Sequence, residues 1–368
     1  MVKYSCNRCN KTFIQKSHYT SHMNRKTPCD KNINLIKELV DQMVEEKLSN
    51  LASQKLRVAS MFCGCGGLDF AFHKLNKNFN VVYANDFDKD SCKTYSDYFK
   101  FGPECKDIKK VDNIPDCDIL TGGFPCQGFS IANLHRKESD SRNELYKELV
   151  RLLKLKKPKY FIFENVKGIL SLGGYENNTD KKNRKGKVFK MIVKDLENCG
   201  YLVNTKLFKL KWYDIPQNRE RVIFFGIRKD IANKISFKWP EETQKITKTL
   251  KDAIGDLPIA YDPKIQHIGT KNKVKITGYM GNRKLDWNAI SPTITGRGGG
   301  TGGPIINIHP SEKRRMTVRE YARIQTFPDN FMFSGSMSSM YRQIGNAVPP
   351  KFSYILANLI IELDRQLF

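Results

Sequence analysis

The larger part of the chain begins with short, mostly apolar runs that differ from the amphipathic segments around them. Residues 57–62 and 81–86 are runs of this kind, and residues 118–120 form the end of another. Such runs are typical of strands that a sheet buries on both faces. Residues 355–367 instead carry apolar side chains at helical spacing, which predicts an amphipathic closing helix.

A helical pattern precedes these strands. Between residues 32 and 54, apolar side chains recur at helical spacing, with charged side chains on the opposite face. The apolar positions are Leu35, Ile36, Leu39, Val40, Met43, Val44, Leu48 and Leu51. The pattern fits a short coiled-coil dimer or a linker helix packed on the following domain, and we favour the linker helix.

Length and charge narrow the classes of function. A chain of 368 residues can hold one large domain and a small one. Its 63 Lys and Arg residues against 38 Asp and Glu residues give a net charge of +25, which favours a polyanionic partner and salt-dependent binding. A lysine-rich solvated surface would give the same charge, so this observation supports a nucleic acid partner without establishing it.

The role of the ten cysteines depends on the compartment in which the protein resides. The first residues, Met-Val-Lys-Tyr-Ser, do not begin a signal peptide, and no apolar stretch approaches the length of a membrane span. Both observations predict an intracellular protein with no membrane partner. In a reducing compartment, cysteine pairs indicate metal binding or catalysis rather than disulfides.

Residues 4–29 contain cysteine and histidine at the spacing of a metal-binding finger. Cys6 and Cys9 are separated by two residues, and His22 follows after twelve more. Cys29 stands where a second histidine would normally follow. The segment resembles a Cys-Cys-His-Cys variant of the zinc finger, which implies one structural Zn²⁺ on these four residues. A flexible basic tail with unrelated cysteines is the alternative.

His18 is a rival to His22 as the third ligand. Choosing His18 would put Phe13 and Tyr19, which occupy two apolar positions of such a finger, out of register. We therefore favour His22. Because a single finger contacts only about three base pairs, the segment predicts a nonspecific DNA-binding or protein-binding module rather than an independent specificity element.

Cys126 is the strongest candidate for covalent chemistry. It lies in Leu120-Thr-Gly-Gly-Phe-Pro-Cys-Gln-Gly-Phe-Ser130, directly after a predicted strand end. Two glycines turn the backbone there, and Pro125 fixes φ just before the cysteine. A thiol held on such a turn is suited to act as a nucleophile, whereas a buried structural cysteine is the alternative.

A second candidate site is a glycine turn between predicted strand 57–62 and a predicted helix at 68–74. The turn reads Cys63-Gly-Cys-Gly-Gly67, and its glycines allow a ligand to approach the backbone at a helix N-terminus. A dinucleotide site is the alternative, but its third glycine would fall on Asp69. Asp86 ends the next predicted strand, where a carboxylate can accept hydrogen bonds from two ribose hydroxyls.

Three further segments follow Cys126 in a recognisable order. They are Phe163-Glu-Asn-Val166, Gln217-Asn-Arg-Glu-Arg-Val222 and Gln343-Ile-Gly-Asn-Ala-Val-Pro349. With the Pro-Cys loop and the glycine turn, they resemble the motifs of the cytosine-5 DNA methyltransferases from about Val58 to the C-terminus. The resemblance implies a Rossmann-like class I methyltransferase fold of the α/β class, S-adenosyl-L-methionine as cofactor and double-stranded DNA as partner, with a monomer favoured.

The resemblance also divides the chain into parts. The Cys and His spacing defines a zinc-finger-like segment at 1–31, and the helical periodicity defines a linker at 32–56. The methyltransferase resemblance implies a catalytic domain at 57–228 that residues 340–368 complete, a target-recognition domain at 229–312, and a connecting helix and hinge at 313–339. Residues 173–187 are rich in Gly, Asn and Lys and show no apolar periodicity, which predicts a mobile insertion that can touch DNA.

The same resemblance places the cofactor on the glycine turn and the neighbouring strand ends. It implies that Asp86 binds the ribose, that Asp107 takes the adenine amino group and that Phe87 stacks on the adenine, while Cys63 and Cys65 are small spacers. The implied cofactor-binding residues are Phe62, Gly64, Gly66, Gly67, Asp86, Phe87, Asp107, Ile108, Asn346 and Ala347.

The implied reaction is covalent catalysis. The Cys126 thiolate would attack carbon 6 of cytosine so that carbon 5 can accept a methyl group, and Glu164 would donate a proton at the ring nitrogen. Arg221 would contact the base carbonyl or a nearby phosphate, and Arg219 would support the loop near Cys126. Because the base must leave the duplex, residues 126–142 are expected to form a closing lid rather than a plain surface loop.

Two rival functions share parts of this pattern. An RNA cytosine-5 methyltransferase would use the same scaffold, but its Cys-Phe-Thr signature does not occur in the sequence. A non-catalytic DNA-binding regulator would need only the finger, and the intact set of Cys126, Glu164 and Arg221 argues against it.

Overall fold

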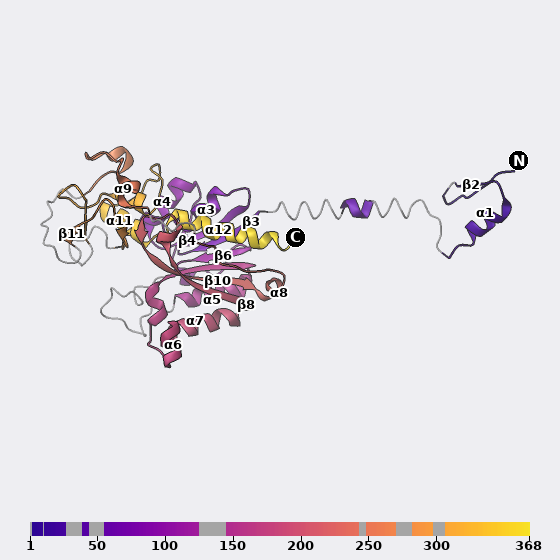
Figure 1. The fold of residues 1–368 in the computed structure, drawn as a ribbon, viewed down its shortest axis with the longest axis horizontal. Coiled ribbons are helices and arrows are strands. Elements are labelled where there is room, and N and C mark those ends of the chain that lie inside the picture. Colours follow the sequence, from indigo (N-terminus) through magenta and orange to yellow (C-terminus); the bar gives the residue numbers. More distant parts are fainter. Residues whose placement is uncertain are drawn as a thin grey trace. The chain divides into compact units, whose positions relative to one another are not determined.

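The computed structural model describes residues 2–9, 11–26, 39–43, 55–124, 145–242, 248–269, 282–296 and 306–368. Its contacts divide the chain into two compact units. The small unit comprises Met1–Gln54 with Phe368, and the large unit comprises Lys55–Leu367 (Figure 1). Within the described residues, no helix has the length and hydropathy that a membrane crossing requires.

The small unit contains a hairpin and one helix. Strands β1 (Tyr4–Ser5) and β2 (Thr12–Phe13) pair antiparallel, and helix α1 (Lys16–Met23) follows them. The Tyr19 ring on α1 stacks on Tyr4 at 5.9 Å and meets the edge of Phe13 at 6.2 Å, measured between ring centroids. Phe13 and Tyr19 therefore contact each other, as the finger-like spacing requires.

A short helical stretch lies within the predicted helix 32–54. Residues 39–43 are helical, and the side chains of Leu39, Val40 and Met43 are exposed. The remainder of that segment lies outside the described residues. The choice between a coiled coil and a packed linker helix therefore stays a prediction.

A seven-stranded sheet forms the centre of the large unit, in the order β5-β4-β3-β6-β7-β10-β8. The first five strands of that order are parallel, and β10 runs antiparallel to both β7 and β8. The strands are β3 (Leu56–Met61), β4 (Phe79–Asp86), β5 (Glu104–Cys105), β6 (Ile119–Gly122), β7 (Tyr160–Val166), β8 (Tyr201–Lys209) and β10 (Glu220–Arg228). The three predicted strands correspond to β3, β4 and β6.

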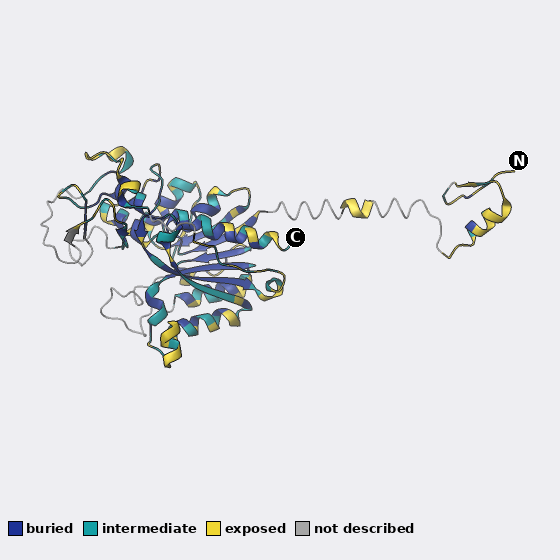
Figure 2. Cartoon of the chain, in the orientation of Figure 1, coloured by how far each residue is buried: buried dark blue, intermediate teal, exposed yellow. Residues whose placement is uncertain are grey.

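Helices cover both faces of this sheet (Figures 1 and 2). They are α3 (Phe70–Lys74), α4 (Lys89–Phe99), α5 (Tyr146–Lys156), α7 (Lys187–Asn198), α8 (Lys229–Ala232) and α12 (Pro350–Arg365), with 3-10 turns η1 (Ile108–Lys110), η3 (Lys167–Ser171) and η4 (Leu210–Tyr213). Helix α6 (Asn178–Asn183) precedes α7 and buries none of its residues. Alternate residues of β7 serve the two faces. Ile162 packs with α3 and α12, whereas Phe161 and Phe163 pack with α5 and α7. The predicted α/β class is confirmed.

A third apolar cluster forms a lobe beside the sheet. Its elements are η5 (Pro263–Ile265), α9 (Leu250–Ile254), α10 (Val318–Ile324), α11 (Met337–Asn346), the parallel pair β11 (Asn282–Lys284) and β13 (Ile306–Ile308), and β12 (Ser291–Pro292), which pairs with β9 (Gln217–Asn218). The described parts of residues 229–312 belong to the same compact unit as the sheet, so a separate recognition domain stays a proposal.

Two helix boundaries differ from the sequence-based predictions. Helix α3 begins at Phe70 instead of Leu68, because residues 67–69 form a turn. Helix α12 begins at Pro350, which suits the first helical turn. The predicted mobile insertion at 173–187 contains helix α6, whose first turn is capped by the Asn177 side chain.

Candidate functional site

The glycine turn after β3 brings three distant segments together. Gly64 has a left-handed φ of 55°, and its backbone N–H donates to Asp86 Oδ2 at 2.8 Å. A Cβ atom on Gly67 would lie 2.2 Å from the carbonyl oxygen of Val348. Gly67 therefore permits the C-terminal segment to approach, so at this position the glycine serves packing within the protein. Phe62, the last residue before the turn, also has a positive φ of 53°.

Asp86 presents an oriented carboxylate at the end of β4. One oxygen accepts from Gly64, and the other accepts from the backbone N–H of Asp88 at 2.9 Å. Burial raises the pKa of Asp86, and the backbone hydrogen bonds oppose that shift. The next side chain, Phe87, is 69% exposed. The buried carboxylate can accept a hydrogen bond from a ligand hydroxyl, and the exposed ring beside it can stack on a flat part of the same ligand.

The other predicted cofactor residues lie on neighbouring segments. Asp107 caps η1 and accepts from the backbone N–H of Lys109 at 3.0 Å. The Ile108 side chain is buried in the core beside α5, which leaves its backbone as the part that could contact a ligand. Asn346 is exposed near Gly296, and the Ala347 carbonyl accepts hydrogen bonds from within the protein.

Glu164 and Arg221 form a buried ion pair at the end of the sheet. In the register of β7 and β10, Glu164 faces Ile223 and Arg221 faces Val166, so the two side chains are diagonal neighbours on one face. Arg221 Nε lies 2.5 Å from Glu164 Oε1, and both residues are buried. The pair lies where the apolar run of that face ends. Its two charges attract each other, although Arg221 Nε and Glu164 Oε1 do not meet the geometry of a hydrogen bond.

The strand that leads to Cys126 ends beside this ion pair. A Cβ atom on Gly123 would lie 3.5 Å from Glu164 Oε2. Asn165 Nδ2 donates to the Phe124 carbonyl at 3.4 Å, and this contact was not anticipated from the sequence. Cys126 itself lies outside the described residues, as does the rest of the predicted lid at 126–142. The structure therefore fixes the exit of β6 beside Glu164 and leaves the nucleophile a prediction.

Arg219 lies two residues before Arg221 but serves a different part of the molecule. Its side chain is fully buried, and its guanidinium donates to the carbonyls of Ile294, Gly345 and Ala347 at 2.9, 3.0 and 2.9 Å. These carbonyls belong to the lobe and to the C-terminal motif. Support of the loop near Cys126 stays a prediction, and the described contacts make Arg219 a tie between the sheet and the C-terminal segment.

Two buried glutamines also join the sheet to the C-terminal segment. The sequence analysis did not predict their role. Gln217 Nε2 donates to Gln325 Oε1 at 2.5 Å, and Gln217 Oε1 accepts from the backbone N–H of Ile294 at 3.0 Å. Gln325 Nε2 donates to the carbonyls of Ile344 and Ala347. The alternating polar residues of the Gln-x-Arg segment could have indicated such contacts, because polar side chains that a sheet buries need hydrogen-bond partners.

A hydrogen-bonded chain of buried polar groups lies next to the glycine turn. The sequence analysis did not predict it. Asp69 accepts from Ser60 Oγ at 2.7 Å and from the Tyr95 hydroxyl at 3.0 Å, and His73 Nε2 lies 2.7 Å from the same hydroxyl. Burial raises the pKa of Asp69 to about 6. Burial lowers the pKa of His73 to about 4. Folding therefore strengthens proton binding at Asp69 and weakens it at His73.

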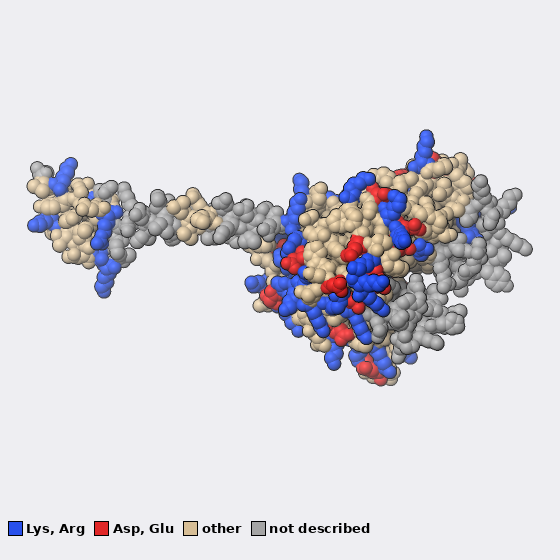
Figure 3. Space-filling model, turned by 180° about the vertical axis from the view of Figure 1, so that it is seen from behind, with Lys and Arg blue, Asp and Glu red and all other residues tan. Residues whose placement is uncertain are grey.

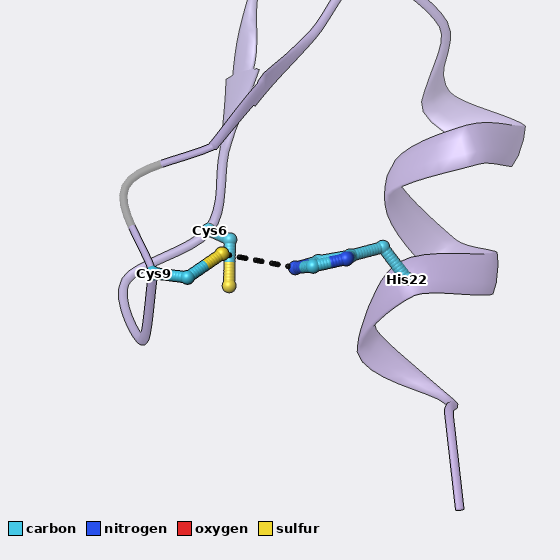
Figure 4. Close-up of side chains that lie close together, drawn as sticks. All are labelled: Cys6, Cys9 and His22. Atoms are coloured by element: carbon cyan, nitrogen blue, oxygen red, sulfur yellow. Dashed lines mark hydrogen bonds between the residues drawn. The ribbon is translucent and has the colours of Figure 1, made fainter. Parts of the chain in front are cut away.

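The small unit gathers three candidate metal ligands. The ligand atoms of Cys6, Cys9 and His22 all lie within 4.8 Å of one another, and Cys9 Sγ lies 3.3 Å from His22 Nε2 (Figure 4). Cys6 and His22 are buried, whereas His18 is exposed. Two thiols and an imidazole in this arrangement fit tetrahedral Zn²⁺. Cys29 lies outside the described residues.

Cys63 and Cys65 behave differently from the finger cysteines. Both are buried beside the glycine turn, and burial, the largest cause, raises the pKa of each thiol. Neither belongs to a group of potential metal ligands among the described residues. They are small neutral side chains, as the interpretation as spacers requires.

Comparison with known proteins places this geometry in context. The profile of the C-5 cytosine-specific DNA methylases matches residues 56–362. The chain is 34% identical over 358 residues to Type II methyltransferase M.NgoFVII of Neisseria gonorrhoeae, covering 87% of this chain and 91% of that protein. It is 35% identical over 379 residues to Type II methyltransferase M.BsuRI of Bacillus subtilis, covering 87% and 82%.

Solved structures with the same fold are more distant in sequence. A putative DNA modification methyltransferase encoded within an E. coli prophage superposes with a TM-score of 0.64 at 23% identity, covering 84% of this chain and 100% of that one. The S. pombe Dnmt2 methyltransferase superposes with a TM-score of 0.63 at 20% identity, covering 85% and 100%. These similarities support the fold.

Proposed function

The chain belongs to the C-5 cytosine-specific DNA methylases and is a DNA (cytosine-5)-methyltransferase, and from this premise we propose which of its residues carry the reaction. Its partner is double-stranded DNA, and its cofactor is S-adenosyl-L-methionine. The proposal rests on one observation above all: the strand that leads to Cys126 ends beside the buried pair of Glu164 and Arg221.

The cofactor site is assigned to the turn after β3 and the ends of the next strands. When bound, S-adenosylmethionine supplies the methyl group. The Asp86 carboxylate, held by two backbone N–H groups, would accept hydrogen bonds from the ribose hydroxyls, and the exposed Phe87 ring would stack on the adenine. Asp107 and the backbone of Ile108 would face the adenine edge, while Gly64, Asn346 and Ala347 would border the site.

Cys126 is assigned as the nucleophile. Its thiolate would form a bond with carbon 6 of the flipped cytosine, which makes carbon 5 electron-rich enough to take the methyl group. The carbon 5 proton then leaves, the sulfur–carbon 6 bond breaks, and the thiolate is recovered. Residues 126–142 would close over the base while it is held outside the duplex.

Glu164 is assigned as the group that meets the ring nitrogen. As sulfur adds to carbon 6, negative charge moves toward that nitrogen, and a carboxyl group hydrogen-bonded there can supply a proton. Arg221, 2.5 Å away, would keep the carboxyl group directed at the base and could itself contact the base carbonyl or a phosphate. Arg219 acts through the backbone carbonyls it binds, as a positioning residue.

A trapping experiment tests the assignment of the nucleophile. Bisulfite sequencing of DNA from cells that express the chain would first identify the methylated sequence. A duplex with 5-fluorocytosine at that site should then form a stable adduct, because fluorine cannot leave as a cation. Mass spectrometry should map the adduct to Cys126. An adduct on another residue would overturn the assignment.

The small unit is proposed to bind one structural zinc ion through Cys6, Cys9, His22 and Cys29. The three described ligands already converge, and bound zinc would join the hairpin to helix α1. Metal analysis of the purified protein should find one equivalent of zinc, and Cys9→Ser should lower it. A full zinc content in that variant would contradict this ligand set.

The biological role is proposed by analogy with the relatives. Type II methyltransferases resemble this chain over most of its length, which supports sequence-specific modification of DNA within a restriction-modification system. In this proposal residues 229–312 form the target-recognition region and residues 313–339 join it to the sheet. Exchange of residues 229–312 with those of a relative of different specificity should change the methylated sequence.

A further inference from the structure

The segment between β7 and α7 carries a dense group of exposed cations. It runs from η3 through α6 to the start of α7, and five of its seven last residues are Lys or Arg with exposed side chains. We name this group the cationic corner, and its members are Lys181, Lys182, Arg184, Lys185 and Lys187. A run of like charge is most often a solvated surface, so the backbone and the neighbouring charges decide whether it has a further role.

The backbone of the segment is held at both ends. The Gly186 N–H donates to the Leu170 carbonyl at 2.9 Å, and the Lys187 N–H donates to the Gly174 carbonyl at 3.0 Å. Between these ties, Asn177 caps α6 by accepting from the Asp180 N–H at 2.8 Å. The cations therefore project from a closed loop with a defined path and not from a loose tail.

The acidic residues of the segment are already paired with another cation. Lys190 on α7 binds Glu176 and also binds Asp180, the latter at 3.1 Å. None of the five cationic corner residues forms an ion pair with any residue that the structure describes. Their positive charge is therefore not neutralised by these two carboxylates, which leaves it available to an external anion.

The cationic corner lies at the active-site edge of the sheet. Strand β7 carries Glu164 near its carboxyl end, and η3 continues directly from that end toward α6. Figure 1 shows α6 at one end of the α7 layer and α8 at the other. Helix α8 follows β10 at the opposite edge, where Ile227 pairs with the first residue of β7. The Gly186 N–H bond to the Leu170 carbonyl of η3 keeps the corner next to the segment that follows the Glu164 end of β7.

We propose that the cationic corner binds phosphates of the duplex beside the target cytosine and sets the affinity and salt dependence of DNA binding, not the rate of methyl transfer. The inference rests on the proposed function. Phosphate contacts position a protein on DNA without reading its sequence. The corner should therefore strengthen binding to target and non-target duplexes alike.

Two matched triple variants test this proposal. In the corner variant, Lys181, Lys182 and Lys185 are changed to Gln. In the control variant, Lys154, Lys229 and Lys234 are changed to Gln; these lysines are also exposed and lie near the opposite edge of the sheet. Both variants lose the same charge by the same substitution. Thermal melting of each protein checks that its fold is retained.

The readouts are the Kd for duplex DNA over a range of salt concentrations and the single-turnover rate at saturating DNA. Each lost phosphate contact should lower the slope of log Kd against log salt by about 0.9, so the corner variant should lose between about 2 and 3 from that slope. The control variant should change it by less than half as much. Single-turnover rates should match the unmodified protein.

Equal effects of the two variants on the salt slope would overturn the proposal, as would a corner variant whose single-turnover rate falls while its Kd is retained. Failure of the proposed function gives a different result. In that case the unmodified protein would transfer no methyl group, whatever its affinity for the duplex.

Discussion

The small and large units differ in what holds each of them together. In the described part of the small unit, Cys6 and His22 are the only buried residues, so its rings supply little protection from water. The large unit buries continuous apolar faces of its sheet between helices. A unit without an apolar core usually depends on a metal or disulfides. We therefore expect the small unit to depend on the proposed zinc ion, whereas apolar packing holds the large unit together.

The small and large units also differ in the signs of the charges that they carry. The described residues 2–9 and 11–26 contain Lys and Arg but no Asp or Glu, and Figure 3 shows blue side chains without red ones on this part of the chain. The large unit carries both signs, and many of its carboxylates are paired. A change confined to one unit should therefore leave the properties of the other unit intact.

The largest expected effect separates catalysis from metal binding. Cys126→Ala should abolish methyl transfer, because the covalent step requires the thiolate. Zinc content and S-adenosylmethionine affinity should be unchanged, since neither site contains this residue. Incorporation of tritiated methyl groups into duplex DNA measures the loss. Incorporation near the unmodified rate would contradict the covalent mechanism.

Glu164→Gln should reduce the single-turnover rate by about a hundred- to ten-thousand-fold, the usual range for general acid–base catalysis. The amide can still hydrogen-bond to the ring but cannot supply the proton. The matched control is Glu220→Gln, which changes a carboxylate that pairs with Lys167 in a neighbouring part of the sheet. If Glu164→Gln slowed the reaction no more than this control, another group would donate the proton.

The third prediction concerns the pH dependence of stability and is confined to the large unit. The pKa of Asp69 is raised from 3.8 to about 6, so the native state binds more protons than the unfolded state between those values. Stability from this group therefore falls as pH rises from about 4 to 6. The pKa of His73 is lowered from 6.5 to about 4, so its contribution rises over almost the same range.

Removal of either group should reveal the pH dependence that the other group gives to the free energy of unfolding. Asp69→Asn should make the free energy of unfolding rise with pH between 4.5 and 6, whereas His73→Gln should make it fall. A difference of one pH unit can change each contribution by up to about 1.4 kcal/mol. Urea unfolding at several pH values measures both variants. Parallel profiles for the variants and the unmodified protein would contradict the opposed titration.

The smallest expected effect follows removal of the small unit. A chain that begins at Ser53 should methylate the same sequence at a similar single-turnover rate, because the proposed catalytic and cofactor residues lie beyond Val58. Its DNA affinity should be modestly weaker and less dependent on salt, since several cations are lost. A changed target sequence would show that the finger contributes to specificity, and the division between the units would then fail.

The sequence allowed prediction of features that depend on local pattern. The runs at 57–62 and 81–86 correspond to β3 and β4, and the cysteine and histidine spacing brought Cys6, Cys9 and His22 together. Periodicity and spacing contain this information, because a strand or a short finger is determined by residues close in the chain.

Contacts between distant segments could not be predicted in the same way. Arg219 binds carbonyls of Ile294 and Gly345, and its partners are backbone atoms that no side-chain pattern marks. Asp69 appeared only as a poor match to a dinucleotide motif, yet Ser60 and Tyr95 hold it in the core. Burial of a polar group is decided by tertiary packing, so it becomes visible only with the fold.

Helix α12 has a consequence for how this protein is made. Ser353 on α12 accepts a hydrogen bond from the backbone N–H of Ala71 at 3.0 Å, and Ala71 lies in the first helix after β3. A ribosome releases the chain from the N-terminus onward, so the first helix must wait for almost the whole message to be translated before it meets its partner. A message broken before the codon for Pro350 should therefore yield no partially active enzyme, and methylation should arise in a cell only with chains that contain α12.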